Sequence, residues 1–288
     1  MPKRLATSHT TYLRSIVFAI LLLVLLSSGV QIVESASVDL QAATQKPRLI
    51  VLTDIGQDPD DEQSFVRLLA YASEFDIEGL IATSHIFDGA DDYAPDLLFD
   101  IIGKYSLVWP NLLLHDPDYP APWELASVIR TGNEVVGAQE NPDLSLSIGP
   151  DRDSDGSNHI IEVVDHPDPR PVNVVIWGGN ADLAQALWRV NNDRTPQEVA
   201  TFISKMRVYS IDDQDNSSEY VRTTFPDLFY IWNDNQQNSA LSVFRGMYRG
   251  GDQTLVSRTW VQTNVTVDHG PLGVRYPETA GGVNGLKE

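Results

Sequence analysis

Five carboxylates follow an apolar run within nine residues, in the stretch LIVLTDIGQDPDDE. They are Asp54, Asp58, Asp60, Asp61 and Glu62. Carboxylates packed together repel one another unless protons or a cation neutralise them, and a hard divalent cation such as Ca²⁺ collects Asp oxygens, carbonyls and waters. The residue types therefore indicate a site for a hard divalent cation such as Ca²⁺, with Asp54 at the end of the apolar run.

A second interpretation of this acidic turn is helix capping. Asp near a helix N-terminus satisfies free N–H groups and favours the helix dipole. Capping accounts for one or two of the acidic residues and leaves Asp54 unexplained, because Asp54 belongs to the preceding run. The spacing also differs from that of an EF-hand, which needs alternating oxygen ligands over about twelve residues and a closing Glu.

The elements that must position these residues alternate between two patterns. LIVLTD is an apolar run typical of a strand covered on both faces, and QSFVRLLAYA has apolar residues at helical spacing. The same alternation predicts strands in FDIEGLIATS, PVNVVIWGG and MRVYSIDD, and helices in PDLLFDIIGKYS, ELASVIRTG, ADLAQALWRVN and PQEVATFISKM. This rhythm predicts an α/β fold with a mainly parallel sheet flanked by helices. In such sheets ligands bind beyond the carboxyl ends of the strands, where Asp54 lies.

Composition sets the limits of the fold and the partners. The chain has 288 residues, 42% of them hydrophobic, and a formal net charge of −20. This charge argues against a nucleic-acid partner, because phosphate binding needs a basic face. Cysteine is absent, so stability must come from the core, hydrogen bonds or a metal. We expect one domain over 46–277, a frayed tail over 278–288, and a long polar loop from about Gln139 to Asp168 that is functional or partly disordered.

The N-terminal segment has the pattern of a secretory signal peptide. Basic residues precede the apolar run SIVFAILLLVLLSSGV, and small residues follow in VESAS. We assign residues 1–37 to this signal and expect a secreted protein with no stable membrane insertion after cleavage. The alternative is an uncleaved membrane anchor, for which about 14 to 16 apolar residues are fewer than the ~20 that span a bilayer.

Several blocks of the sequence resemble one family. A strand ending in Asp, a Gly two residues later and an Asp-Asp pair opening a helix resemble the signature of the inosine-uridine-preferring nucleoside hydrolases. TDIGQDPDDEQSFVRLLAYASEFDIEGLIATS is more similar still to the nucleoside-hydrolase-like domain of cellulose-binding proteins of the Sde182 type. RPVNVVIWGGNADLAQALW, MRVYSIDDQDNSSEYVRTTFPDLFYI and HGPLGVRYP resemble further blocks of that branch in order.

The resemblance implies a doubly wound α/β domain that binds Ca²⁺ at the carboxyl ends of its strands. It implies that Asp54 is both a metal ligand and the general base, and that Asp61 is the second carboxylate ligand. Asp60 matches the residue that contacts ribose, the backbone carbonyl of Trp177 matches a main-chain ligand, and Asn180 is a polar contact or a turn residue. The region from Asp212 to Asn216 aligns loosely with sugar contacts, and no single residue in it is singled out.

Three departures separate this chain from the nucleoside hydrolases. Asp58 and Pro59 lengthen the acidic turn by two residues, so Asp60 and Asp61 can be displaced. His85 stands in the turn where that family has an Asn, so a sugar contact is expected to differ. His85 acts either as an acid or base there, or it is an exposed or capping residue. The late Asp that completes the metal site has no clear counterpart, which suggests a C-terminally truncated domain, and Asp268 is a poor substitute because it precedes a block that already matches.

Two functions follow as expectations. The first is a Ca²⁺-dependent hydrolase acting on the N-glycosidic bond of a ribonucleoside or on a related glycosidic bond, which makes the partner a nucleoside or a carbohydrate. The second is a binding module for carbohydrate, such as cellulose, on the same fold. Fold resemblance alone does not decide between them, because function belongs to the site.

Overall fold

The computed structural model describes residues 45–56, 59–84, 94–139, 141–233 and 252–278. From Lys46 onward they belong to one compact unit. Six parallel strands form one sheet, in the order β3-β2-β1-β4-β5-β6. The strands are β1 (Arg48–Thr53), β2 (Asp76–Ala82), β3 (Ile129–Thr131), β4 (Val172–Ile176), β5 (Met206–Ser210) and β6 (Phe229–Trp232).

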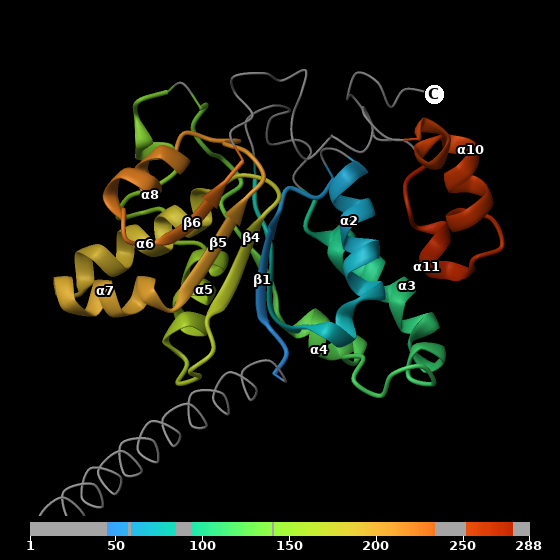
Figure 1. Ribbon diagram of the computed structural model, residues 1–288. Coiled ribbons are helices and arrows are strands. Elements are labelled where there is room, and N and C mark those ends of the chain that lie inside the picture. The colour runs from blue at the N-terminus through green and yellow to red at the C-terminus, as the bar shows by residue number, and fades with distance from the viewer. Residues whose placement is uncertain (1–44, 57–58, 85–93, 140, 234–251, 279–288) are drawn as a thin grey trace, which may run out of the picture. The chain divides into compact units, whose positions relative to one another are not determined.

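Helices cover both faces of this sheet, which makes the fold doubly wound, as expected (Figure 1). One face carries α2 (Pro59–Ala70), α3 (Asp96–Leu112), α4 (Pro122–Ser127) and α11 (Gly270–Val274). The other carries α5 (Asp155–Asp165), α6 (Ala181–Asp193), α7 (Pro196–Ser204) and α8 (Ser218–Thr224). A short helix, α10 (Arg258–Val261), precedes α11, with a π-helical turn at Gln262–Thr266 between them. Three-residue and four-residue 3₁₀ turns lie at Ala72–Glu74, Leu144–Leu146 and Gln253–Val256.

Strand β1 shows why its sequence is apolar without interruption. Leu49 and Val51 pack into the core on the side of α2 and α3, whereas Ile50 and Leu52 pack into the core on the side of α5 and α6. Successive strand side chains point to opposite faces, so a strand with helices on both sides needs an apolar residue at every position. Both cores therefore meet at β1 and hold its carboxyl end in a fixed place.

Two sequence-based expectations were wrong in detail. Only the first part of ELASVIRTG is helical, because the β-branched residues that follow form the edge strand β3, where the N–H of Leu80 donates to the Val128 carbonyl at 3.0 Å. The polar segment from Gln139 to Asp168 contains α5 rather than one long loop. Ser154 and Ser157 cap this helix reciprocally, and Ile160 and Val164 bury its apolar face.

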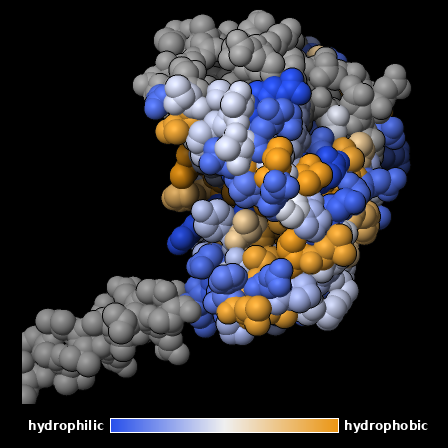
Figure 2. All heavy atoms as spheres, turned by 90° about the vertical axis from the view of Figure 1, so that its right-hand side faces the viewer, coloured by the Kyte–Doolittle hydropathy of each residue, from blue (hydrophilic) through white to orange (hydrophobic). Residues whose placement is uncertain are grey.

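The outer face of α3, α10 and α11 is mixed in polarity. Figure 2 shows hydrophobic side chains among charged ones on this side of the molecule. The C-terminal helices are tied to the domain by polar contacts, since Arg275 pairs with Glu62 at 2.5 Å and with Asp100 at 2.6 Å. Within the described residues, no helix is both long and apolar enough to cross a membrane. The signal-like residues 1–37 lie outside the described part.

Candidate functional site

The acidic turn lies at the point where the sheet reverses its winding. From β1 the chain proceeds outward to β2 and β3, and it then returns to β4 on the other side of β1. Loops that leave the carboxyl ends of two such neighbouring strands diverge and open a crevice, which is where open α/β sheets bind ligands. Asp54 directly follows β1, and Trp177 to Asn180 directly follow β4. The residues that were predicted from separate motifs therefore come from adjacent strands.

Asp61 is bonded back to the end of β1. Its Oδ2 atom accepts the hydroxyl of Thr53 and, at 3.1 Å, the backbone N–H of Asp54. Asp61 stands in the first turn of α2, yet its carboxylate is hydrogen-bonded to the end of β1. The capping interpretation therefore does not account for this carboxylate.

Burial makes the charge of these two residues costly. Asp54 is 8% exposed and Asp61 is 5% exposed. Burial raises the pKa of Asp54 well above its usual range, and the neighbouring Asp61 charge raises it further. Burial also raises the pKa of Asp61, although its hydrogen bonds act in the opposite direction. Asp60, half-buried beside them, adds repulsion to both. A shared proton or a bound cation would relieve this repulsion.

A glycine brings the end of β4 into contact with Asp54. A Cβ atom at Gly178 would lie only 2.6 Å from the Cβ and Cγ atoms of Asp54. Only a residue without a side chain fits this approach. The backbone after Trp177, which the family resemblance implies as a main-chain ligand, is therefore packed directly against the proposed general base.

The Trp177 carbonyl already has one hydrogen-bond partner. It accepts the side-chain amide of Gln214 at 2.6 Å. A carbonyl oxygen has two lone pairs, so this bond leaves one for a second partner. Gln214 belongs to the Asp212 to Asn216 region that the sequence placed loosely at the site, and its role as a contact of Trp177 was not predicted.

Asn180 turns toward β6. It is the residue before α6 and is 1% exposed; its side-chain amide donates to the hydroxyl of Tyr230 at 3.3 Å. It makes no side-chain capping bond, so it is not simply a helix cap. Its Oδ1 atom is buried and has no hydrogen-bond partner among the residues that the structure describes. A ligand hydroxyl could satisfy that oxygen.

Two further buried carboxylates near the site were not singled out in the sequence, although Asp215 belongs to the Asp212 to Asn216 region. Asp215 accepts the backbone N–H groups of Asn180 at 2.6 Å and Ala181 at 2.9 Å, which fixes the start of α6. Asp182 accepts the N–H of Asn133 at 3.0 Å and the hydroxyl of Ser154. Burial raises the pKa of both carboxyls. No motif marks either residue, because each acts through contacts between segments far apart in the chain.

The donors present fit a hard cation in part. Two buried carboxylates, with a third beside them and a carbonyl close by, are the oxygen ligands that Ca²⁺ prefers. Among the described residues, no three His, Asp or Glu side chains lie close enough together to form a complete metal cluster by themselves. His85 and Asp58 lie outside the described residues. Asp268 is exposed, with a φ of 61°, in the turn before α11.

Comparisons with known proteins found one matching family and a similar solved structure. Residues 48–285 match the family described as cellulose-binding Sde182, nucleoside hydrolase-like domain. A solved structure of a nucleoside hydrolase-related hypothetical protein from Saccharophagus degradans, described as associated with carbohydrate metabolism, matches with 36% identity and a TM-score of 0.68. The match covers 81% of this chain and 51% of that one, so this chain spans about half the length of its relative. No curated protein matches.

The family match extends over most of the chain and includes the strands, the acidic turn and the β4 turn that build the site. This chain belongs to the Sde182 family, through its nucleoside hydrolase-like domain.

Proposed function

We propose that the site between β1 and β4 hydrolyses a glycosidic bond, either the N-glycosidic bond of a ribonucleoside or a related bond in a carbohydrate. The observation that carries this proposal is the contact of two buried carboxylates, Asp54 and Asp61, at the switch point of the sheet. Cleavage of such a bond builds oxocarbenium-like positive charge on the sugar, which nearby carboxylates stabilise.

Asp54 is proposed as the general base. A carboxylate whose pKa is raised by burial accepts a proton more readily, which suits the removal of a proton from the attacking water. Asp61, held by Thr53 and by the Asp54 backbone, positions this group, and Asp60 faces the sugar. Ca²⁺, with Asp54, Asp61 and the Trp177 carbonyl as its proposed ligands, would supply a Lewis acid that lowers the pKa of a bound water.

The test is a hydrolysis screen of ribonucleosides and aryl glycosides, with Ca²⁺ and with EDTA. We expect Ca²⁺-dependent turnover by the wild-type protein and a loss of ~10³-fold in Asp54→Asn, because the general base and a metal ligand are removed together. Turnover that Asp54→Asn leaves unchanged would exclude this assignment.

The second candidate is a carbohydrate-binding module without catalysis. One observation favours it, which is that the matching family is described as cellulose-binding. Sedimentation with insoluble cellulose, measured beside the hydrolysis screen, separates the candidates, because a pure binding module sediments without turnover. On either proposal the protein acts outside the cell, which the signal-like N-terminus supports.

A further inference from the structure

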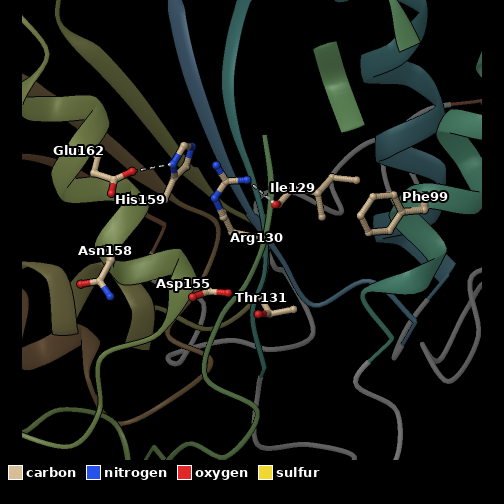
Figure 3. Close-up of a pocket in the computed structure, with 8 residues that line it drawn as sticks. All are labelled: Phe99, Ile129, Arg130, Thr131, Asp155, Asn158, His159 and Glu162. Carbon is tan, nitrogen blue, oxygen red and sulfur yellow. Dashed lines mark hydrogen bonds and ion pairs between the residues drawn. The ribbon is translucent and has the colours of Figure 1, made fainter. Parts of the chain in front are cut away.

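A second cavity lies at the open edge of the sheet, beside β3. Its volume is about 620 Å³, within the range of small-molecule sites. Residues of α5 and β3 line it together with Phe99 of α3 (Figure 3). Strand β2 separates β3 from β1, so this cavity is distinct from the crevice at Asp54.

A buried histidine in this cavity lacks a hydrogen-bond partner on one side. His159 is 8% exposed, and its Nε2 lies 2.7 Å from the Glu78 carbonyl. A carbonyl only accepts, so Nε2 carries the hydrogen and Nδ1 of the neutral ring is an acceptor. Nδ1 is buried without a hydrogen-bond partner within the described residues, and the nearest carboxylate oxygen, on Glu162, is 3.6 Å away. That separation is too long for a hydrogen bond. Nδ1 and the Glu162 carboxylate are therefore neighbouring acceptors when the ring is neutral, and no hydrogen bond joins them.

The guanidinium of Arg130, opposite His159, has donors that no hydrogen bond among the described residues uses. The Nη1 group of Arg130 donates to the carbonyls of Ser127 at 2.8 Å and Ile129 at 2.7 Å. Across the described part of the chain, Arg130 forms no ion pair and its Nε and Nη2 groups make no hydrogen bond. In Figure 3 its guanidinium and the ring of His159 point toward one another from β3 and α5. The cavity thus offers donors and acceptors side by side.

The balance of these groups selects the class of ligand. Asp155 and Glu162 exceed Arg130 by one negative charge, which disfavours an anion, while the guanidinium disfavours a simple cation. A neutral ligand with many hydroxyls can donate to the carboxylates and accept from Arg130 and Asn158. Phe99, which is 49% exposed, supplies an apolar surface for the C–H face of a ring.

We propose that this cavity, lined by His159, Glu162, Asp155, Arg130 and Phe99, is a binding site for a carbohydrate chain, separate from the acidic crevice. It does not depend on whether the crevice is catalytic. A sugar hydroxyl donates to the Glu162 carboxylate, another sugar oxygen accepts from Arg130, and a sugar ring packs on Phe99.

The test is isothermal titration calorimetry of the whole protein with cellotetraose. We expect saturable binding, and we expect Glu162→Gln and Phe99→Ala each to weaken it about tenfold or more, because a hydrogen bond to a charged group or an apolar contact is lost. Both substituted side chains are exposed, so the variants should fold; circular dichroism verifies this. Matched controls are Glu74→Gln, an exposed acid outside the cavity, and Leu107→Ala on α3, which is 64% exposed.

Binding that both controls and Asp61→Asn retain, and that both cavity variants lose, supports the proposal and separates it from the crevice. The proposal is overturned if wild-type protein does not bind cellotetraose, or if either cavity variant binds as well as its control. It is also overturned if Asp61→Asn alone abolishes binding, because the sugar would then occupy the crevice.

Discussion

The carboxylate of Asp61 accepts the backbone N–H of Asp54 at 3.1 Å, which bonds the first turn of α2 to the end of β1. The same oxygen accepts the hydroxyl of Thr53. One carboxylate therefore fixes both the direction in which the chain leaves the strand and the place of the proposed base. This bond keeps Asp61 at the strand end.

Asp61→Ala should destabilise the protein because it leaves two buried donors, the Thr53 hydroxyl and the Asp54 N–H, without their acceptor. We expect a loss of ~2–3 kcal/mol in the free energy of unfolding, measured by urea denaturation. Asp61→Asn keeps one oxygen and should lose less. A loss below about 0.5 kcal/mol for Asp61→Ala would place this residue among ordinary surface acids.

Calcium should stabilise the wild-type protein, and it should stabilise neither the Asp54→Asn nor the Asp61→Asn variant. A ligand at 100 times its Kd adds ~2.7 kcal/mol, which is measurable as a rise in Tm that EDTA reverses. Asp58→Asn, in the pair of residues by which this turn is expected to exceed that of the nucleoside hydrolases, should change this rise little. Equal and small effects of all three substitutions would favour surface charge over a metal site.

Gly178→Ala should damage the site more than the fold. The added methyl would lie 2.6 Å from the Asp54 side chain, so Asp54 or the β4 turn must shift. We expect ~1–3 kcal/mol of destabilisation and loss of the Ca²⁺ effect. Gly103→Ala is the matched control, because its methyl meets no atom within 4 Å inside α3 and should stabilise the helix by ~0.5–1 kcal/mol. A Gly178→Ala protein with normal Ca²⁺ stabilisation would show that this close packing is not required.

The parts of the fold that the sequence predicted are those that local patterns determine. LIVLTD and PVNVVIWGG are apolar at nearly every position because helices cover both faces of the central strands, and Asp54 stands where such a strand must end. The doubly wound sheet and the meeting of Asp54 with the turn after Trp177 followed from the family resemblance. The structure confirmed the fold, and it places these two segments in contact.

The parts that were missed depend on contacts between distant segments. Strand β3 has only three residues, and its β-branched residues form a strand because β2 offers its edge, although the sequence pattern predicted a helix through them. Asp182 accepts a hydrogen bond from Asn133, which is 49 residues away, and Asp215 accepts one from Asn180, which is 35 residues away. Nothing near either residue in the sequence marks it as buried. The hydrogen-bonding state of His159 likewise depends on the Glu78 carbonyl, which lies 81 residues away.

The final prediction concerns the opposite end of the sheet, where Arg170 holds Asp168. The guanidinium donates to the Asp168 carboxylate, with the shortest contact at 2.6 Å, and this bond lowers the pKa of Asp168 from 3.8 to about 2. A carboxyl whose pKa is lower in the folded protein stabilises it above the unfolded pKa, and this contribution disappears as the pH falls from about 4 to about 2.

Asp168→Asn should therefore lower the free energy of unfolding by ~1 kcal/mol at pH 7, a value reduced for solvent screening because the side chain is 19% exposed. The difference from wild type should shrink as the pH falls through this window, since the wild-type carboxylate then becomes protonated and neutral like the amide. Urea denaturation at pH 7, 4 and 2.5 measures it. A difference that stays constant over this range would mean that Asn fails through lost hydrogen-bond geometry rather than through lost charge.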